Sequence, residues 1–169
     1  MRTLYLLRHA KSSWAESGPD HDRPLAPRGS RAARMMAEHL VAAGVRPSLV
    51  LCSSAVRTRA TLDALKPALY RSAVSVEPEL YGADAAEILD RLRGVEPDAE
   101  SVMVIGHNPG LQDLAIELAG DGEHAALAQL HAKFPTAALA TLDLGDTTWG
   151  RLGARRTYLT KLVVPKQLT

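Results

Sequence analysis

Two arginines and two histidines in this sequence each follow an apolar segment, near the point where a buried strand would end. They are Arg8 and His9 after residues 3–7, Arg57 after residues 48–52, and His107 after residues 101–105. Guanidinium groups match the oxygens of a tetrahedral oxyanion with paired hydrogen bonds, because their N–H groups form a planar fork. A neutral imidazole beside such an anion is a competent nucleophile, and neighbouring cations help to keep it neutral. If the four side chains meet, their chemistry favours phosphoryl transfer to a histidine.

The apolar segments have the length and composition of strands buried in a parallel sheet. Strands are predicted over residues 3–7, 48–52, 74–77 and 101–105. Helices are predicted over residues 29–41, from Arg57 to an end at Pro67, over residues 84–92, from Pro109 onwards, and over residues 125–131. Strands that alternate with helices form mostly parallel sheets, and ligands bind at the carboxyl ends of such strands. The four side chains are therefore expected to share one crevice.

Short motifs predict where several helices begin and end. Asp84 and Glu87 have the spacing of a capping box, with Asp in place of Ser or Thr. Gly44 is well placed to end the first helix. Asn108 and Pro109 are predicted as the N-cap and first residue of a helix. The first amides of that helix, and its positive end, would then point at the same anion.

The last third of the chain adds an antiparallel feature. Residues 136–144 and 147–152, separated by Gly145 and Asp146, are predicted to form a hairpin. The fold class that follows is α/β: a three-layer αβα sandwich whose central, mostly parallel sheet carries an antiparallel hairpin at its edge. A chain of 169 residues is expected to form a single domain, residues 1–169.

The composition is that of an ordinary globular protein, with 46% hydrophobic residues and a formal net charge of +1. Near-neutral charge argues against nucleic-acid and anionic-membrane partners, which select a strong basic excess. The single cysteine, Cys52, lies in an apolar run and is interpreted as a core residue. The N-terminal apolar run is too short for a signal peptide, and no run approaches a membrane span. We therefore expect a cytoplasmic protein.

Four blocks of the sequence resemble the histidine phosphatase superfamily, whose fold is phosphoglycerate mutase-like. They are Leu6-Leu7-Arg8-His9-Ala10-Lys11-Ser12-Ser13-Trp14, Arg23-Pro24-Leu25 with Arg28-Gly29, Ser53-Ser54-Ala55-Val56-Arg57-Thr58 with Thr61, and Val104-Ile105-Gly106-His107-Asn108-Pro109-Gly110. The first block resembles the Arg-His-Gly signature of that superfamily, with Ala10 in place of the glycine. The set as a whole is most similar to the small bacterial phosphohistidine phosphatases of the SixA-like branch.

The resemblance implies a role for each matching residue. His9 would be the nucleophile that becomes phosphorylated, while the guanidiniums and the second imidazole would hold the phosphoryl oxygens. The substrate-binding candidates are Arg8, Ser12, Arg57, His107 and Asn108. Ala10 predicts an ordinary backbone conformation where many relatives have glycine.

Two carboxylates compete for the role of general acid. Larger relatives place a carboxylate after the third strand, where it protonates the leaving oxygen. Glu79, in Pro78-Glu79-Leu80-Tyr81-Gly82, falls in that region. Asp22, in a loop expected over the first strand tip from residues 15 to 28, is the alternative. If the substrate is a phosphohistidine, neither is needed, since the P–N bond is labile and protonated imidazole is a good leaving group.

Residues and resemblance together predict an enzyme without a metal or another cofactor. The remaining histidines, including a loop residue expected on the surface, His21, lack the spacing of a metal site. The expected activity is a phosphatase that hydrolyses phosphohistidine on a partner protein, or a phosphomonoester, through a phosphohistidine formed on His9. The alternatives are a small-molecule phosphomonoesterase of the acid phosphatase type and a phosphate-binding module without catalysis.

Overall fold

A seven-stranded sheet forms the centre of the molecule. The computed structural model describes residues 1–15 and 17–169. The strands are β1 (Arg2–Arg8), β2 (Leu49–Ser53), β3 (Ala73–Glu77), β4 (Ser101–Gly106), β5 (Ala119–Gly122), β6 (Leu139–Gly145) and β7 (Thr157–Val163). Their order is β3-β2-β4-β1-β6-β7-β5, and among these described strands β6 alone runs against the others.

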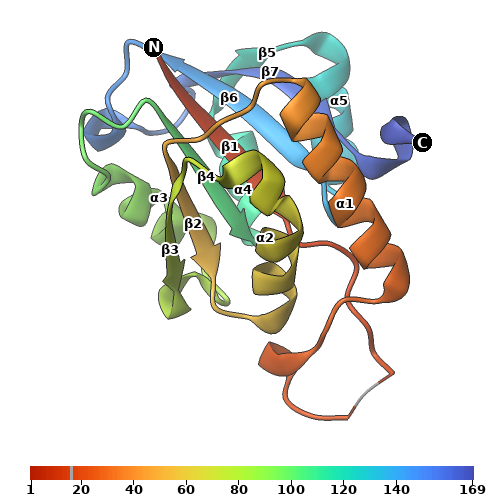
Figure 1. Ribbon diagram of the computed structural model, residues 1–169. Helices are drawn as coiled ribbons and strands as arrows, with labels where there is room; N and C mark the ends of the chain where they lie inside the picture. The colour runs from red at the N-terminus through yellow and green to blue at the C-terminus, as the bar shows by residue number, and fades with distance from the viewer. Residues whose placement is uncertain (16) are drawn as a thin grey trace.

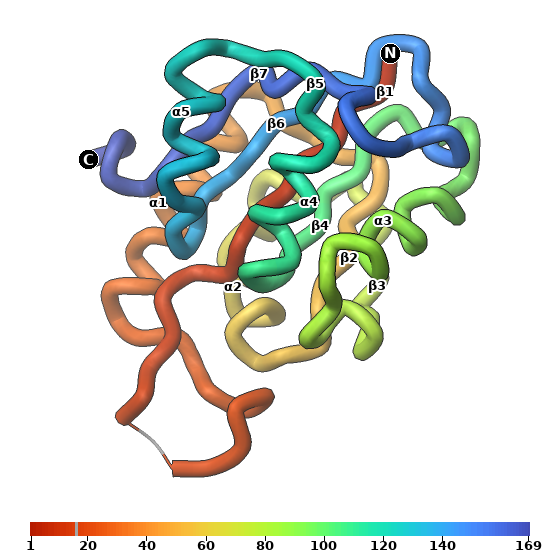
Figure 2. The backbone as a smooth tube through the Cα atoms, turned by 180° about the vertical axis from the view of Figure 1, so that it is seen from behind, coloured from red at the N-terminus to blue at the C-terminus, as the bar shows by residue number. Residues whose placement is uncertain are grey.

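Helices cover both faces of this sheet. They are α1 (Pro27–Ala42), α2 (Val56–Leu69), α3 (Ala85–Arg93), α4 (Gly110–Leu118) and α5 (His124–Ala132). Helices α1 and α2 lie in front of the sheet in Figure 1, whereas α3, α4 and α5 lie in front of it in the reverse view of Figure 2. The buried apolar side chains form a large cluster on each face. The three layers and the mostly parallel sheet confirm the predicted fold class.

Strand register brings the predicted site residues to one edge of the sheet. Ile105 of β4 pairs with Leu7 of β1 and with Cys52 of β2, so the three strands end at the same level. His9 and His107, which follow β1 and β4, therefore leave the sheet side by side. Parallel strands place such residues where α/β sheets bind ligands.

Several local predictions are confirmed. The amide of Glu87 donates to Oδ1 of Asp84 at 2.8 Å, and the amide of Asp84 donates to Oε1 of Glu87 at 3.1 Å. Gly44 has a φ of +69°, the left-handed conformation expected of a residue that ends a helix. Cys52 is fully buried, and this burial raises the pKa of its thiol to about 12. It is a core residue.

The ends of the first two helices differ from the predictions. Helix α1 begins at Pro27, two residues before the predicted start, which shortens the expected loop; residue 16 of that loop lies outside the described residues. Helix α2 continues through Pro67 to Leu69. Proline removes one backbone donor, but here it stands in the last turn, where a single helical hydrogen bond is lost.

The antiparallel pair forms with a different second strand. Residues 147–152, predicted as a strand, contain a short 3-10 helix, Trp149–Arg151, and β7 pairs with β6 instead. The side chain of Trp149 explains this difference, because it is fully buried and its Nε1 donates to the carbonyl of Ala99 at 2.8 Å. Strand β5, which was not predicted, pairs with β7 and takes the sheet edge, so the antiparallel pair lies one strand further in.

In residues 1–15 and 17–169, every helix is either too short or too polar to span a bilayer.

Candidate active site

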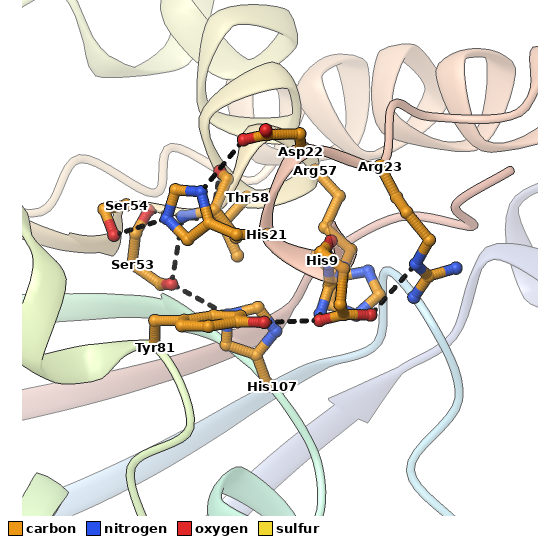
Figure 3. Close-up of polar contacts among 12 residues, drawn as sticks. His9, His21, Asp22, Arg23, Ser53, Ser54, Arg57, Thr58, Tyr81 and His107 are labelled. Atoms are coloured by element: carbon orange, nitrogen blue, oxygen red, sulfur yellow. Dashed lines mark hydrogen bonds and ion pairs between the residues drawn. The ribbon is translucent and has the colours of Figure 1, made fainter. Parts of the chain in front are cut away.

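The four predicted side chains meet at the carboxyl edge of the sheet. The rings of His9 and His107 lie 5.3 Å apart between centroids. His9 and Arg57 each expose 6% of their surface, and Arg8 is partly buried beside them. Figure 3 shows His9, Arg57 and His107 converging from three separate segments. The expectation that these side chains come together is confirmed, and a crevice that they share stays a prediction.

The imidazole of His9 is oriented by the backbone. Its Nδ1 lies 2.7 Å from the carbonyl oxygen of Ala10. A carbonyl can only accept, so Nδ1 carries the proton and the lone pair of Nε2 is left free. The Ala10 amide donates to Oγ1 of Thr61 in α2 at 3.0 Å, which fixes this carbonyl in turn. Ala10 is not among the described residues that have a positive φ, which agrees with the ordinary backbone conformation predicted for alanine there.

Burial and charge keep the His9 ring neutral. Burial lowers the pKa of His9 from 6.5 to about 3, and the positive charges of Arg57 and Arg8 act in the same direction. The hydrogen bond from Nδ1 to Ala10 opposes these effects, but it is the weaker influence. A neutral ring with a free Nε2 lone pair is the form of histidine that attacks an electrophile.

Ser53, at the end of β2, holds His107. The Ser53 Oγ lies 2.8 Å from Nε2 of His107. When the hydroxyl donates to Nε2, the proton of the neutral ring stands on Nδ1. Burial lowers the pKa of His107 to about 4, with Arg57 as the next cause.

Three buried nitrogens beside His9 have no partner: the Nε–H groups of Arg8 and Arg57, and Nδ1 of His107, which carries a proton when Ser53 donates to Nε2. Within the described chain, the buried side-chain nitrogens or oxygens without a hydrogen bond are Nε of Arg2, Arg8 and Arg57 and Nδ1 of His107. Arg2 opens β1 and so lies at the opposite end of that strand from the site. Leaving a buried donor unsatisfied costs roughly 1–3 kcal/mol, more when it is charged. Two guanidinium donors around one nucleophile, joined by Nδ1 of His107 when it carries the proton, therefore define a place for an oxyanion.

The carbonyl of Phe134 ties together Arg8 and Asn108. It accepts from Nη1 of Arg8 at 3.2 Å and from Nδ2 of Asn108 at 2.9 Å. Oδ1 of Asn108 accepts from the amide of Gln112 at 3.3 Å. Both ends of the Asn108 side chain are thus engaged, so its predicted role in binding substrate gains no support from these contacts.

The start of α4 also differs from its prediction. The helix begins at Gly110 with Pro109 as its N-cap, so Asn108 lies one residue before the cap. The amide of Leu111 donates to the carbonyl of His107, and the next amide is the one bound by Asn108. These two amides are occupied within the turn and do not face the anion, whereas the expected contribution of the positive end of the helix stays a prediction.

Three residues of the site were missed by the sequence analysis. Asp20 pairs with Arg57, with Oδ2 accepting from Nη2 at 3.0 Å, and Oδ2 also accepts from the Tyr81 hydroxyl at 2.6 Å. His21, predicted on the surface, is partly buried: its Nε2 lies 2.9 Å from Oγ of Ser54. The Tyr81 ring stands edge-on between His21 and His107, at 4.8 and 5.6 Å between centroids. These contacts hold residues 20–21 against α2 and against the segment after β3.

The other predicted site residues make no described hydrogen bond or ion pair with Arg8, His9, Arg57 or His107. Ser12 is buried, and its described contact is a bridge to Leu25. Glu79 is exposed and lines a pocket between residues 77–80 and α3. Asp22 is exposed and lies 3.3 Å from Nδ1 of His21. The roles proposed for these side chains stay predictions. Within residues 1–15 and 17–169, His, Cys, Asp and Glu form no group of three that could hold a metal ion.

Comparison with known proteins identifies the class. Residues 4–88 match the histidine phosphatase superfamily (branch 1), and the chain belongs to that family. An uncharacterized protein of Mycobacterium tuberculosis is 40% identical over 143 residues, which cover 80% of this chain and 85% of the relative.

Solved structures place the chain in the SixA-like branch of that superfamily. A Nakamurella multipartitia protein described as a candidate phosphohistidine phosphatase SixA is 33% identical, with a TM-score of 0.83 and coverage of 97% of this chain and 96% of the relative. The protein histidine phosphatase SixA complexed with tungstate is 25% identical, with a TM-score of 0.79 and coverage of 99% of both chains. The resemblance seen in the sequence is confirmed, and it supports phosphatase activity on a phosphorylated substrate.

Proposed function

We propose that the protein is a metal-independent phosphatase that hydrolyses phosphohistidine on another protein through a covalent intermediate on His9. The observation that carries this proposal is the pair of unpartnered N–H donors on Arg8 and Arg57, with the unpartnered Nδ1 of His107, beside the neutral ring of His9. A phosphoryl group in front of Nε2 would satisfy these donors. The tungstate bound by a SixA relative is also a tetrahedral oxyanion, which supports the same class of ligand here.

The reaction has two displacements at phosphorus. In the first, Nε2 of His9 bonds to phosphorus while the bond from phosphorus to the substrate nitrogen breaks, and the leaving nitrogen takes up a proton. In the second, a water oxygen bonds to phosphorus, the P–Nε2 bond breaks, and inorganic phosphate leaves with the neutral imidazole restored. The two guanidiniums would stabilise the charge on the equatorial oxygens in both steps, the role that a metal ion fills elsewhere.

The described residues favour a leaving group that needs little acid. The carboxylate of Asp20, which is bound to Arg57, also accepts from Tyr81 and Arg23, and these hydrogen bonds hold its pKa well below the ordinary range. An ionised Asp20 has no proton to give. An imidazole leaving group fits such a site better than an alkoxide does, since it leaves readily once it carries a proton.

A comparison of substrates tests this proposal. Phosphate release is measured from a phosphohistidine-bearing protein, from p-nitrophenyl phosphate and from common sugar phosphates, with the wild type and His9→Ala. We expect the highest kcat/KM on the phosphohistidine protein and no turnover by His9→Ala. Preference for a sugar phosphate would favour the small-molecule phosphomonoesterase. Tight phosphate binding without turnover on every substrate would favour the non-catalytic binding module.

A further inference from the structure

Asp20 is bound to Arg57 by two hydrogen bonds at once. Nη1 of Arg57 donates to the backbone carbonyl of Asp20 at 2.8 Å, and Nη2 donates to its carboxylate at 3.0 Å. The same carboxylate accepts from the Tyr81 hydroxyl at 2.6 Å and from Nε of Arg23 at 3.0 Å. Asp20 therefore joins the loop after β1, the helix α2 and the segment after β3 at one point.

The geometry of a guanidinium determines which N–H groups of Arg57 remain free when Asp20 is bound. Its two Nη groups share one edge of the plane, and Nε shares another edge with Nη2. Asp20 occupies the edge formed by the two Nη groups, whereas Nε of Arg57 is buried and unpartnered. Arg8 is arranged in the same way, since its Nη1 is tied to the Phe134 carbonyl and its Nε is free. In both arginines the edge that includes Nε is left for a ligand.

We propose that Asp20 is a positioning residue, which holds Arg57 so that its Nε edge faces the phosphoryl group in front of His9. This inference rests on the proposed phosphatase function. The Arg57 side chain is 8% exposed, whereas the side chain of Asp20 is 48% exposed, so the arginine is buried in the site and its partner lies at the surface. Asp20 thus acts on the substrate through Arg57.

The opposite role, competition with the substrate, would require the carboxylate to repel the phosphoryl group. Repulsion is weak at a half-exposed site, because water screens a charge there. Loss of a fixed arginine is costly, because bidentate recognition of phosphate depends on alignment of the fork. Removal of the carboxylate would tighten phosphate binding if it repels the ligand, and would weaken phosphate binding if it positions Arg57. The Kd for phosphate therefore distinguishes the two roles.

A double-mutant cycle tests the inference. Asp20→Ala, Asp20→Asn, Arg57→Ala and the Asp20→Ala/Arg57→Ala pair are compared with wild type. Asp63→Ala is the matched control, because it removes an exposed carboxylate of α2 that is paired with Lys66 at 3.2 Å. The readouts are the Kd for inorganic phosphate from isothermal titration and the kcat/KM for p-nitrophenyl phosphate.

Asp20→Ala is expected to weaken phosphate binding and kcat/KM by about tenfold, in line with the loss of a hydrogen bond to a charged group. Asp20→Asn should lose less, since its amide oxygen can still accept from Arg57 and Tyr81. In the Arg57→Ala background, Asp20→Ala should have no further effect, and Asp63→Ala should match the wild type. Thermal unfolding checks that each variant folds. If Asp20→Ala does not fold, the comparison of Asp20→Asn with the wild type decides the outcome.

Two results would overturn the inference. Tighter phosphate binding by Asp20→Ala or Asp20→Asn would mean that the carboxylate competes with the ligand. An effect of equal size in the Arg57→Ala background would mean that Asp20 does not act through Arg57. If the phosphatase proposal itself is wrong, the wild type and every variant would lack turnover, while the Kd values for phosphate would still show the coupling between Asp20 and Arg57.

Discussion

Replacing His9 should remove part of the acid sensitivity of folding. Burial lowers the pKa of His9 from 6.5 to about 3. The unfolded chain takes up this proton below pH 6.5, but the folded state does so only near pH 3, so stability falls as the pH falls through this window. At pH 5 the unfolded imidazole is about 97% protonated and the folded one about 1%. At about 1.4 kcal/mol per pH unit, the cost at pH 5 is about 2 kcal/mol.

Urea unfolding at pH 7 and pH 5 measures this cost. The loss of unfolding free energy between the two pH values should be about 2 kcal/mol smaller in His9→Gln than in the wild type, whatever the stability of the variant at pH 7. His131→Gln, at an exposed position of α5, controls for the loss of an imidazole and should retain the wild-type difference. Equal pH dependence in the wild type and His9→Gln would refute a His9 that is buried and neutral.

Three other perturbations test the charge-stabilising groups. Arg57→Lys should lower kcat/KM for p-nitrophenyl phosphate by about 10- to 100-fold, because an ammonium lacks the parallel donors of the guanidinium. The control Arg34→Lys, on the exposed face of α1, should leave kcat/KM unchanged. Ser53→Ala should lower kcat/KM by roughly fivefold to tenfold through loss of the hydroxyl that holds His107, and a wild-type rate would count against that role. EDTA should leave kcat/KM unchanged; a loss restored by a divalent ion would contradict metal-independent chemistry.

The sequence predicts those parts of the site that follow a strand directly. Arg8 and His9 end β1, and His107 follows β4, so the rules of parallel sheets suffice to bring them together. Arg57 was found in the same way, one turn beyond β2. The hydrogen bond that orients His9 joins neighbouring residues, and a need for such a carbonyl can be foreseen from the chemistry of a neutral nucleophile.

Contacts between distant segments were beyond prediction from one sequence. Asp20 meets Arg57 across 37 residues and Tyr81 across 61, and no periodicity or spacing encodes either pair. The anchor of Arg8 is a backbone carbonyl, that of Phe134, which any residue at that position would supply. For this reason residue types alone gave no signal for it.

The second antiparallel strand was misplaced for a related reason. Residues 147–152 have the residue types of a strand, but burial of Trp149 against the carbonyl of Ala99 turns the chain there into a short helix. The tertiary contact overrides the local preference. Strand β5 is short and rich in glycine, so its sequence carries little strand signal before β7 is in place.

Trapping the protein during turnover tests whether His9 becomes phosphorylated. The protein is mixed with a phosphohistidine-bearing substrate, quenched within the first turnover without acid, and digested for mass spectrometry. We expect a phosphoryl group on Nε2 of His9 that decays as inorganic phosphate appears, and none in His9→Ala. Rapid turnover with no phosphoryl group on His9, or with the group on another residue, would contradict it.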